Sequence, residues 1–133
     1  MCAVRTHGWP HTFVARPWDD IASFLGVMAE RDLSFAYMTA VIKSVMESDA
    51  TDALAATTSM HDLVVTPTPV SEPPLDVVIV RAPSSLHRPL SGHVLIEQQS
   101  LTGHNDRIER PATEAVPLFW RFMIEKFGVQ PSG

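Results

Sequence analysis

Cysteine is almost missing from this chain of 133 residues, which has only Cys2. One cysteine cannot form an internal disulfide, so no disulfide framework holds the fold. Lysine is nearly as scarce, with Lys43 and Lys126 the only two, and the formal net charge is -5. Nucleic-acid binding relies on clustered cations, so this charge balance predicts no nucleic-acid partner.

Long apolar runs are also missing. The first residues lack the apolar core of a signal peptide, and the runs 24–28 and 36–42 are too short to span a bilayer. We therefore expect a cytoplasmic protein with no membrane partner. The chain also has no glycine-rich nucleotide loop and no CxxC pair, HExxH or GxSxG motif, so we expect no cofactor and no metal.

The composition that remains is that of a folded domain. Hydrophobic residues make up 45% of the chain and charged residues 19%, which supplies a core and is too little charge for an extended disordered chain. The length fits one domain over residues 1–133. A mean hydropathy of +0.06 is high for a small monomer and predicts that apolar surface is covered by a second copy, as a homodimer, or by a ligand.

Helical spacing of apolar residues appears early and late in the chain. It predicts helices over 17–31 and over 34–48, the second behind a capping Ser34. An alanine-rich stretch predicts a short third helix over 51–60. The last helix starts behind Thr113 as cap, carries a broad aromatic stripe and ends at Gly128 in the left-handed conformation.

Strand-like segments occupy the middle of the chain. Four are expected, over 63–66, 76–81, 93–101 and 106–110, and two short ones could precede the helices, over 3–6 and 12–15. Four prolines make 66–74 an extended surface loop within the domain, which serves as a stiff connector or as a docking segment. The pattern predicts an α+β fold: an antiparallel sheet of about four strands, covered on one face by two or three N-terminal helices and the aromatic-rich C-terminal helix.

The turn Thr102-Gly103-His104-Asn105 favours a hairpin between the last two strands. If His104 and Asn105 form a two-residue loop, Leu101 faces Ile108 and Gln99 faces Arg110, which pairs apolar with apolar and polar with polar.

This register suggests a polar site on one sheet face. His93 and Glu97 share strand parity and so project from the same face, with Gln99 beyond them and Arg110 on the neighbouring strand. Glu97 or His93 would move a proton, and Arg110 would hold a carboxylate or a developing oxyanion. The alternative is a solvated sheet surface with an ordinary cross-strand ion pair.

Three further features are weaker candidates. Tyr37 lies off the apolar stripe of its helix and could line a substrate pocket or cap the core, and His104 could contact substrate from the turn. His7 and His11 have the i, i+4 spacing of helical metal ligands, but Gly8 and Pro10 between them disfavour a helix.

Two functions remain open. One is a small cofactor-independent acid–base enzyme, of cyclase, isomerase or lyase type, that acts on an apolar or carboxylate-bearing small molecule or peptide. The other is a non-catalytic interaction module, such as an adaptor or immunity-type protein. A deep pocket around His93 and Glu97 favours the enzyme, and a flat solvated face favours the module.

Overall fold

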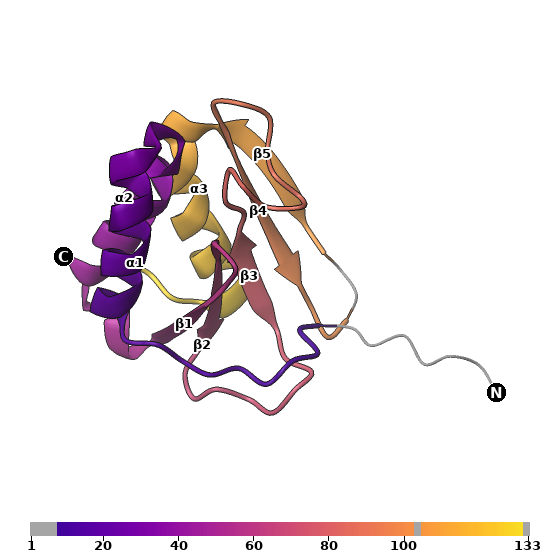
Figure 1. Ribbon diagram of the computed structural model, residues 1–133. Coiled ribbons are helices and arrows are strands. Elements are labelled where there is room, and N and C mark those ends of the chain that lie inside the picture. The colour runs from indigo at the N-terminus through magenta and orange to yellow at the C-terminus, as the bar shows by residue number, and fades with distance from the viewer. Residues whose placement is uncertain (1–7, 103–104, 132–133) are drawn as a thin grey trace.

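The computed structural model describes residues 8–102 and 105–131, which form three α-helices and five strands (Figure 1). The helices are α1 (Trp18–Arg31), α2 (Ala36–Met46) and α3 (Ala115–Phe122). The strands are β1 (Leu54–Ser59), β2 (Asp62–Pro67), β3 (Val77–Val80), β4 (His93–Gln99) and β5 (Arg107–Pro111). The predicted α+β class with helices packed on an antiparallel sheet is confirmed, with one strand more than expected.

The five strands lie in the sheet in chain order, each antiparallel to the next. Two residues, Met60 and His61, connect β1 to β2, and Met60 adopts the left-handed conformation with φ 57° that such a tight turn requires. The proline-rich stretch between β2 and β3 forms neither helix nor ladder from residue 68 to 76, apart from one isolated bridge at Leu75. Residues 66 and 67, predicted to start this loop, belong to β2.

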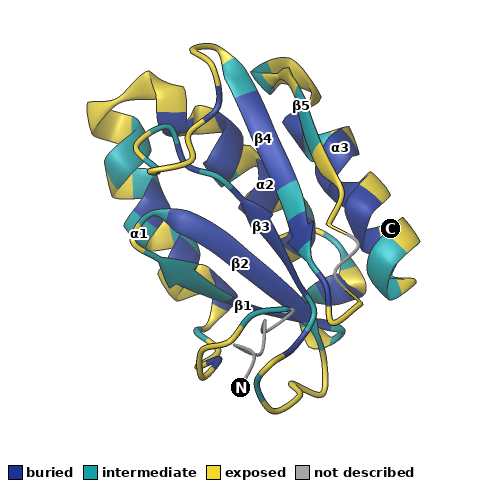
Figure 2. Cartoon of the chain, turned by 90° about the vertical axis from the view of Figure 1, so that its right-hand side faces the viewer, coloured by how far each residue is buried: buried dark blue, intermediate teal, exposed yellow. Residues whose placement is uncertain are grey.

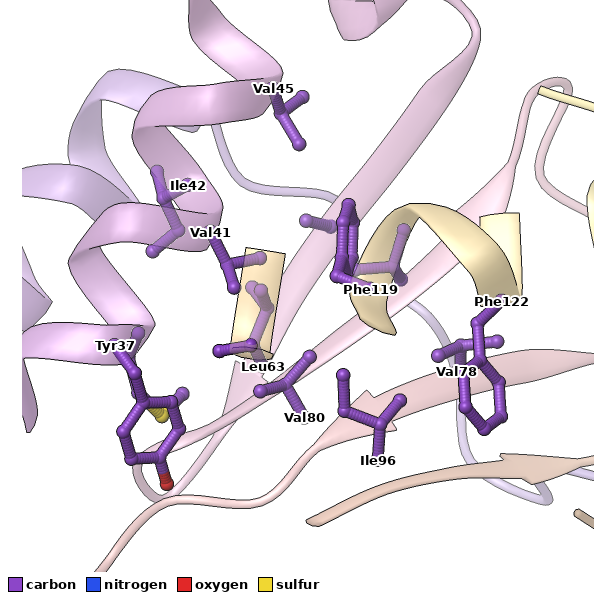
Figure 3. Close-up of a cluster of buried hydrophobic side chains, with 14 of the residues drawn as sticks. Tyr37, Val41, Ile42, Val45, Leu63, Val78, Val80, Ile96, Phe119 and Phe122 are labelled. Carbon is purple, nitrogen blue, oxygen red and sulfur yellow. The ribbon is translucent and has the colours of Figure 1, made fainter. Parts of the chain in front are cut away.

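All three helices cover the same face of the sheet (Figure 1). Alternate strand residues, among them Leu63, Val80 and Ile96, meet side chains of α2 and α3 such as Val41 and Phe119 (Figure 3). Helices α2 and α3 follow the predicted apolar stripes, because each must bury one side against the sheet. No helix within the described residues is long and apolar enough to cross a membrane.

The opposite face of the sheet is partly covered by the N-terminal segment, residues 9–16. Trp9 bridges to Leu75 and Arg16 bridges to Ala56, so the segment crosses the sheet between these points. Phe13 packs there in a second apolar cluster whose other buried members are Ala55, Val64, Leu75, Val77 and Ile79. Because both faces are covered here, β2 and β3 are buried at consecutive positions, as Figure 2 shows.

Residues 12–15 make no ladder, so the predicted N-terminal strand is wrong there, and the predicted strand over 3–6 lies outside the described residues. The predicted helix over 51–60 is also wrong. Ser48 caps a short 3-10 turn, Asp49–Asp52, and the chain then enters β1. Alanine favours a helix only weakly, and pairing with β2 together with burial of Ala55 and Ala56 on opposite faces decides for a strand.

The helix ends differ from the sequence expectation in their caps. Asp32, not Ser34, caps the turn before α2, because its carboxylate accepts from both the backbone N–H and the hydroxyl of Ser34. Thr113 lies inside a 3-10 turn, Ala112–Glu114, and does not cap α3. The last turns widen to a π-helix, Met123–Phe127, and end at Gly128 with φ 67°, which confirms the predicted left-handed end.

Candidate functional site

His93 and Glu97 lie on the face of the sheet turned away from the helices, and their shared strand parity is as predicted. The next residues on the opposite parity, Val94 and Ile96, belong to the helix-side core. Four residues of extended chain nevertheless separate the two side chains by about 13 Å along the strand. His93 and Glu97 therefore occupy two different surroundings.

Arg110 does not join them, because the predicted hairpin register is wrong. In the sheet Arg110 lies opposite Val94, and Ile108 lies opposite Ile96. This pairing is shifted by five residues from the predicted one, and an odd shift moves Arg110 to the helix side of the sheet.

The physical reason for the shift is a longer connection between the strands. The Asn105 side chain accepts from the backbone N–H of Ser100, which ends β4 early. The Leu101 N–H then donates to the carboxylate of Asp76, which draws the chain towards the loop before β3.

Glu97 instead belongs to a cluster of four charges that we call the ion-pair cluster: Asp62, Arg81, Glu97 and Arg107. Arg81 donates to both oxygens of Glu97, at 3.1 and 3.3 Å, and its third nitrogen donates to Asp62 at 2.9 Å. Arg107 adds an ion pair to Glu97 at 3.8 Å. Burial alone would lower the pKa of Arg81, but the hydrogen bonds and charges of Glu97 and Asp62 outweigh it and raise that pKa. Two cations neutralise two carboxylates, so Glu97 is held as an ion-pair partner with both oxygens occupied.

Asp62 and Arg81 are the residues that the sequence reasoning missed. Each stands at the end of an apolar strand run, and β2 and β3 are antiparallel with Leu63 opposite Val80. Pairing those two runs as neighbours would have placed Asp62 beside Arg81 and indicated the ion pair.

Asp62 also holds the loop that follows β3, residues 82–92. Its Oδ1 accepts from the backbone N–H of Ala82 at 2.7 Å, and its Oδ2 accepts from the Ser85 hydroxyl at 3.0 Å. The loop is not paired to a strand, and the ion-pair cluster fixes its first residues in place.

That loop forms one wall of a cavity of about 710 Å³. The other walls are the start of α2 and the turn into α3, so three segments far apart in the chain meet here. Tyr37 and His93, two of the predicted site residues, both line the cavity. Figure 3 shows the Tyr37 ring against the core with its oxygen at the outer end, where the hydroxyl donates to the Arg81 carbonyl at 2.5 Å.

Apolar side chains at this cavity stay exposed. Leu33 and Leu90 line it and are 84% and 68% exposed. Arg88 is the only lysine or arginine and His93 the only histidine among the described lining residues, and none of them is acidic. The cavity therefore combines apolar walls with positive charge, in a protein whose net charge is negative.

The chain matches no protein-family model, no curated protein and no solved structure. The chemistry of the cavity is therefore the main indication of function.

Gln99, another predicted site residue, lies apart from the cavity. Gln99 is half-buried at the far end of β4, opposite Val77, and His104 lies outside the described residues. The same is true of His7, whereas His11 makes an edge contact with Trp9. Across residues 8–102 and 105–131 no three His, Cys, Asp or Glu side chains are grouped so that they could hold a metal ion. The catalytic roles predicted for His93, Glu97 and Arg110 stay predictions.

Proposed function

We propose that this protein is a non-catalytic binding module that holds an apolar small molecule in the cavity between α2, the 82–92 loop and the turn into α3. The observation that carries the proposal is the exposure of Leu33 and Leu90 on the cavity wall. A ligand that covered two such leucines would gain about 1 to 2 kcal/mol from each. Water-exposed leucines that line a concave site are typical of binding surfaces.

The construction of the walls supports the same proposal. Pro83 and Pro89 stiffen the loop, and Asp62 ties its first residues to the sheet. On the opposite side Tyr37 is fixed by its hydrogen bond to Arg81. A cavity whose walls are held in place before binding loses little entropy when the ligand enters.

Binding of the neutral fluorescent probe N-phenyl-1-naphthylamine tests this function. We expect its emission to rise with wild-type protein and to saturate. Ala36 is exposed and lines the cavity, so an Ala36→Trp substitution fills the space with an indole ring. Leu33→Ser removes apolar wall. Each variant should weaken probe binding about tenfold. For Leu33→Ser this factor corresponds to the free energy of roughly one lost leucine contact.

Leu86→Ser is the matched control, because Leu86 is 93% exposed in the same loop but does not line the cavity. It should bind the probe as the wild type does. If the wild type fails to bind, or if Leu86→Ser weakens binding as much as Leu33→Ser, the proposal is overturned.

A cofactor-independent acid–base enzyme is the second candidate. It is favoured by one observation, that His93 lines the same cavity as Tyr37 and could transfer a proton to a bound molecule. Incubation of a bound ligand with the protein, followed by NMR of that ligand, separates the two functions. New ligand signals that disappear with His93→Gln support the enzyme, and an unchanged ligand supports the binding module.

A further inference from the structure

We infer that the ligand of this cavity is an aliphatic monocarboxylate, whose carboxylate is received by Arg88 and His93 while its chain lies along Leu33 and Leu90. This inference rests on the proposed function and goes beyond it by naming the ligand class.

Charge is the first argument. The chain carries 15 acidic residues against 10 lysines and arginines, yet no acidic residue is among those that line the cavity. Arg88 and His93, which can both carry positive charge, are among the lining residues instead. A cationic amphiphile would be repelled by Arg88. A neutral amphiphile would give the guanidinium no charged group to bind.

The lack of a side-chain partner for Arg88 is the second argument. Within the described residues all six ion pairs involve other groups, and Arg88 makes no side-chain hydrogen bond. Arg81, by contrast, uses all three of its nitrogens to bind Asp62 and Glu97. Arg88 is therefore the guanidinium in this part of the molecule that still has its fork of donors to offer.

His93 can present a second donor to the same carboxylate. Its Nδ1 lies 3.2 Å from the carbonyl oxygen of Ser91, and because a carbonyl only accepts, Nδ1 carries a proton in this contact. The other ring nitrogen, Nε2, then donates to a ligand carboxylate only in the imidazolium form, in which both ring nitrogens carry protons. The hydroxyls of Ser34 and Thr113 also line the cavity and can complete the shell around an oxygen anion.

The rest of the lining suits a hydrocarbon chain. Besides the two leucines, Val116, Ala40 and Ala115 present only carbon side chains. The Tyr37 hydroxyl is already committed to the Arg81 carbonyl, so it does not demand a polar partner from the ligand. The cavity volume of about 710 Å³ lies within the range of small-molecule sites.

Displacement of N-phenyl-1-naphthylamine by decanoate, 1-decanol and decyltrimethylammonium tests the inference. The three competitors share a ten-carbon chain and differ in the charge of the head. We expect decanoate to displace the probe at a concentration about tenfold lower than decanol, and decyltrimethylammonium to be the weakest. Arg88→Gln and His93→Gln should each remove much of the preference for decanoate, measured as the ratio of the decanol to the decanoate concentration that displaces the probe from the same variant.

Two matched variants control for charge and for ring chemistry. Arg110→Gln removes an exposed arginine that does not line the cavity, and His87→Gln removes an exposed histidine from the same loop. Both should keep the wild-type preference. If the probe binds but decanoate and decanol compete equally, or if Arg110→Gln acts like Arg88→Gln, the inference is overturned while the proposed function stands. If the probe does not bind, the proposed function itself fails.

Discussion

At the scale of single residues, the buried phenol of Tyr37 has a raised pKa. It is the only tyrosine in the chain and its side chain is buried between the core and the cavity. Burial raises its pKa well above the ordinary value near 10, and the nearby negative charge of Asp62 adds to the shift. The phenol therefore stays protonated in the folded protein at a pH where an exposed tyrosine ionises.

We predict that this shift makes the protein lose stability above pH 10. Below that pH the phenol is protonated in both states and contributes no pH dependence. Above it the unfolded chain releases the proton and the folded chain keeps it, so each further pH unit costs up to about 1.4 kcal/mol until the folded pKa is reached.

Tyrosinate absorbance near 295 nm measures this directly, since one tyrosine reports alone. The signal should appear together with loss of the circular dichroism of the folded chain. A smooth titration at pH 10 in folded protein would contradict the prediction, and Tyr37→Phe should abolish the signal.

At the scale of elements, the Asp62 carboxylate holds the start of the 82–92 loop at Ala82 and Ser85. We predict that Asp62→Asn destabilises the protein by about 2 to 3 kcal/mol, because a neutral amide loses the charged partner of Arg81 and weakens the bonds to Ala82 and Ser85. Chemical denaturation measures the cost. The same variant should weaken binding of the neutral probe, because its loop wall is no longer held.

The Lys43–Glu47 ion pair on α2 is the matched control. The Glu47 side chain is 64% exposed, whereas that of Asp62 is 10% exposed. Glu47→Gln should therefore change stability by less than about 0.5 kcal/mol. Equal effects of the two substitutions would show that burial does not decide the strength of these pairs.

The sequence predicts strand parity well and strand register poorly. Parity depends only on the alternation of side chains, so His93 and Glu97 were correctly placed on one face. Register depends on where a turn closes, and here Asn105 and Asp76 bind backbone groups of Ser100 and Leu101 that a two-residue turn would leave in the ladder. The cavity was not predictable for the same reason, because it forms where α2, a loop and the turn into α3 meet, and Arg88 carries no periodic signal.

At the scale of the whole molecule, two apolar clusters share one sheet. The helix-side cluster uses one set of strand residues, and the cluster under the N-terminal segment uses the alternate set on the same strands, for example Val65 and Val64. Neither face can lose its cover without exposing strands that hold the other. The homodimer predicted from the composition stays a prediction, and it would add a third covered surface to these two.

This sharing predicts that the molecule unfolds in one step even when only the N-terminal segment is weakened. Phe13 is 8% exposed, so Phe13→Ala should cost about 3 kcal/mol and lower the melting temperature by roughly 10 °C. The fall should be seen in helical circular dichroism at 222 nm, although Phe13 lies across the sheet from every helix. Val14→Ala, at a neighbouring residue that is 67% exposed, should leave the melting temperature within about 2 °C. A shared sheet transmits the loss of one cluster to the other. If Phe13→Ala instead left the helical transition at its wild-type temperature and produced a separate, earlier transition in tryptophan fluorescence, the two faces would be independent units.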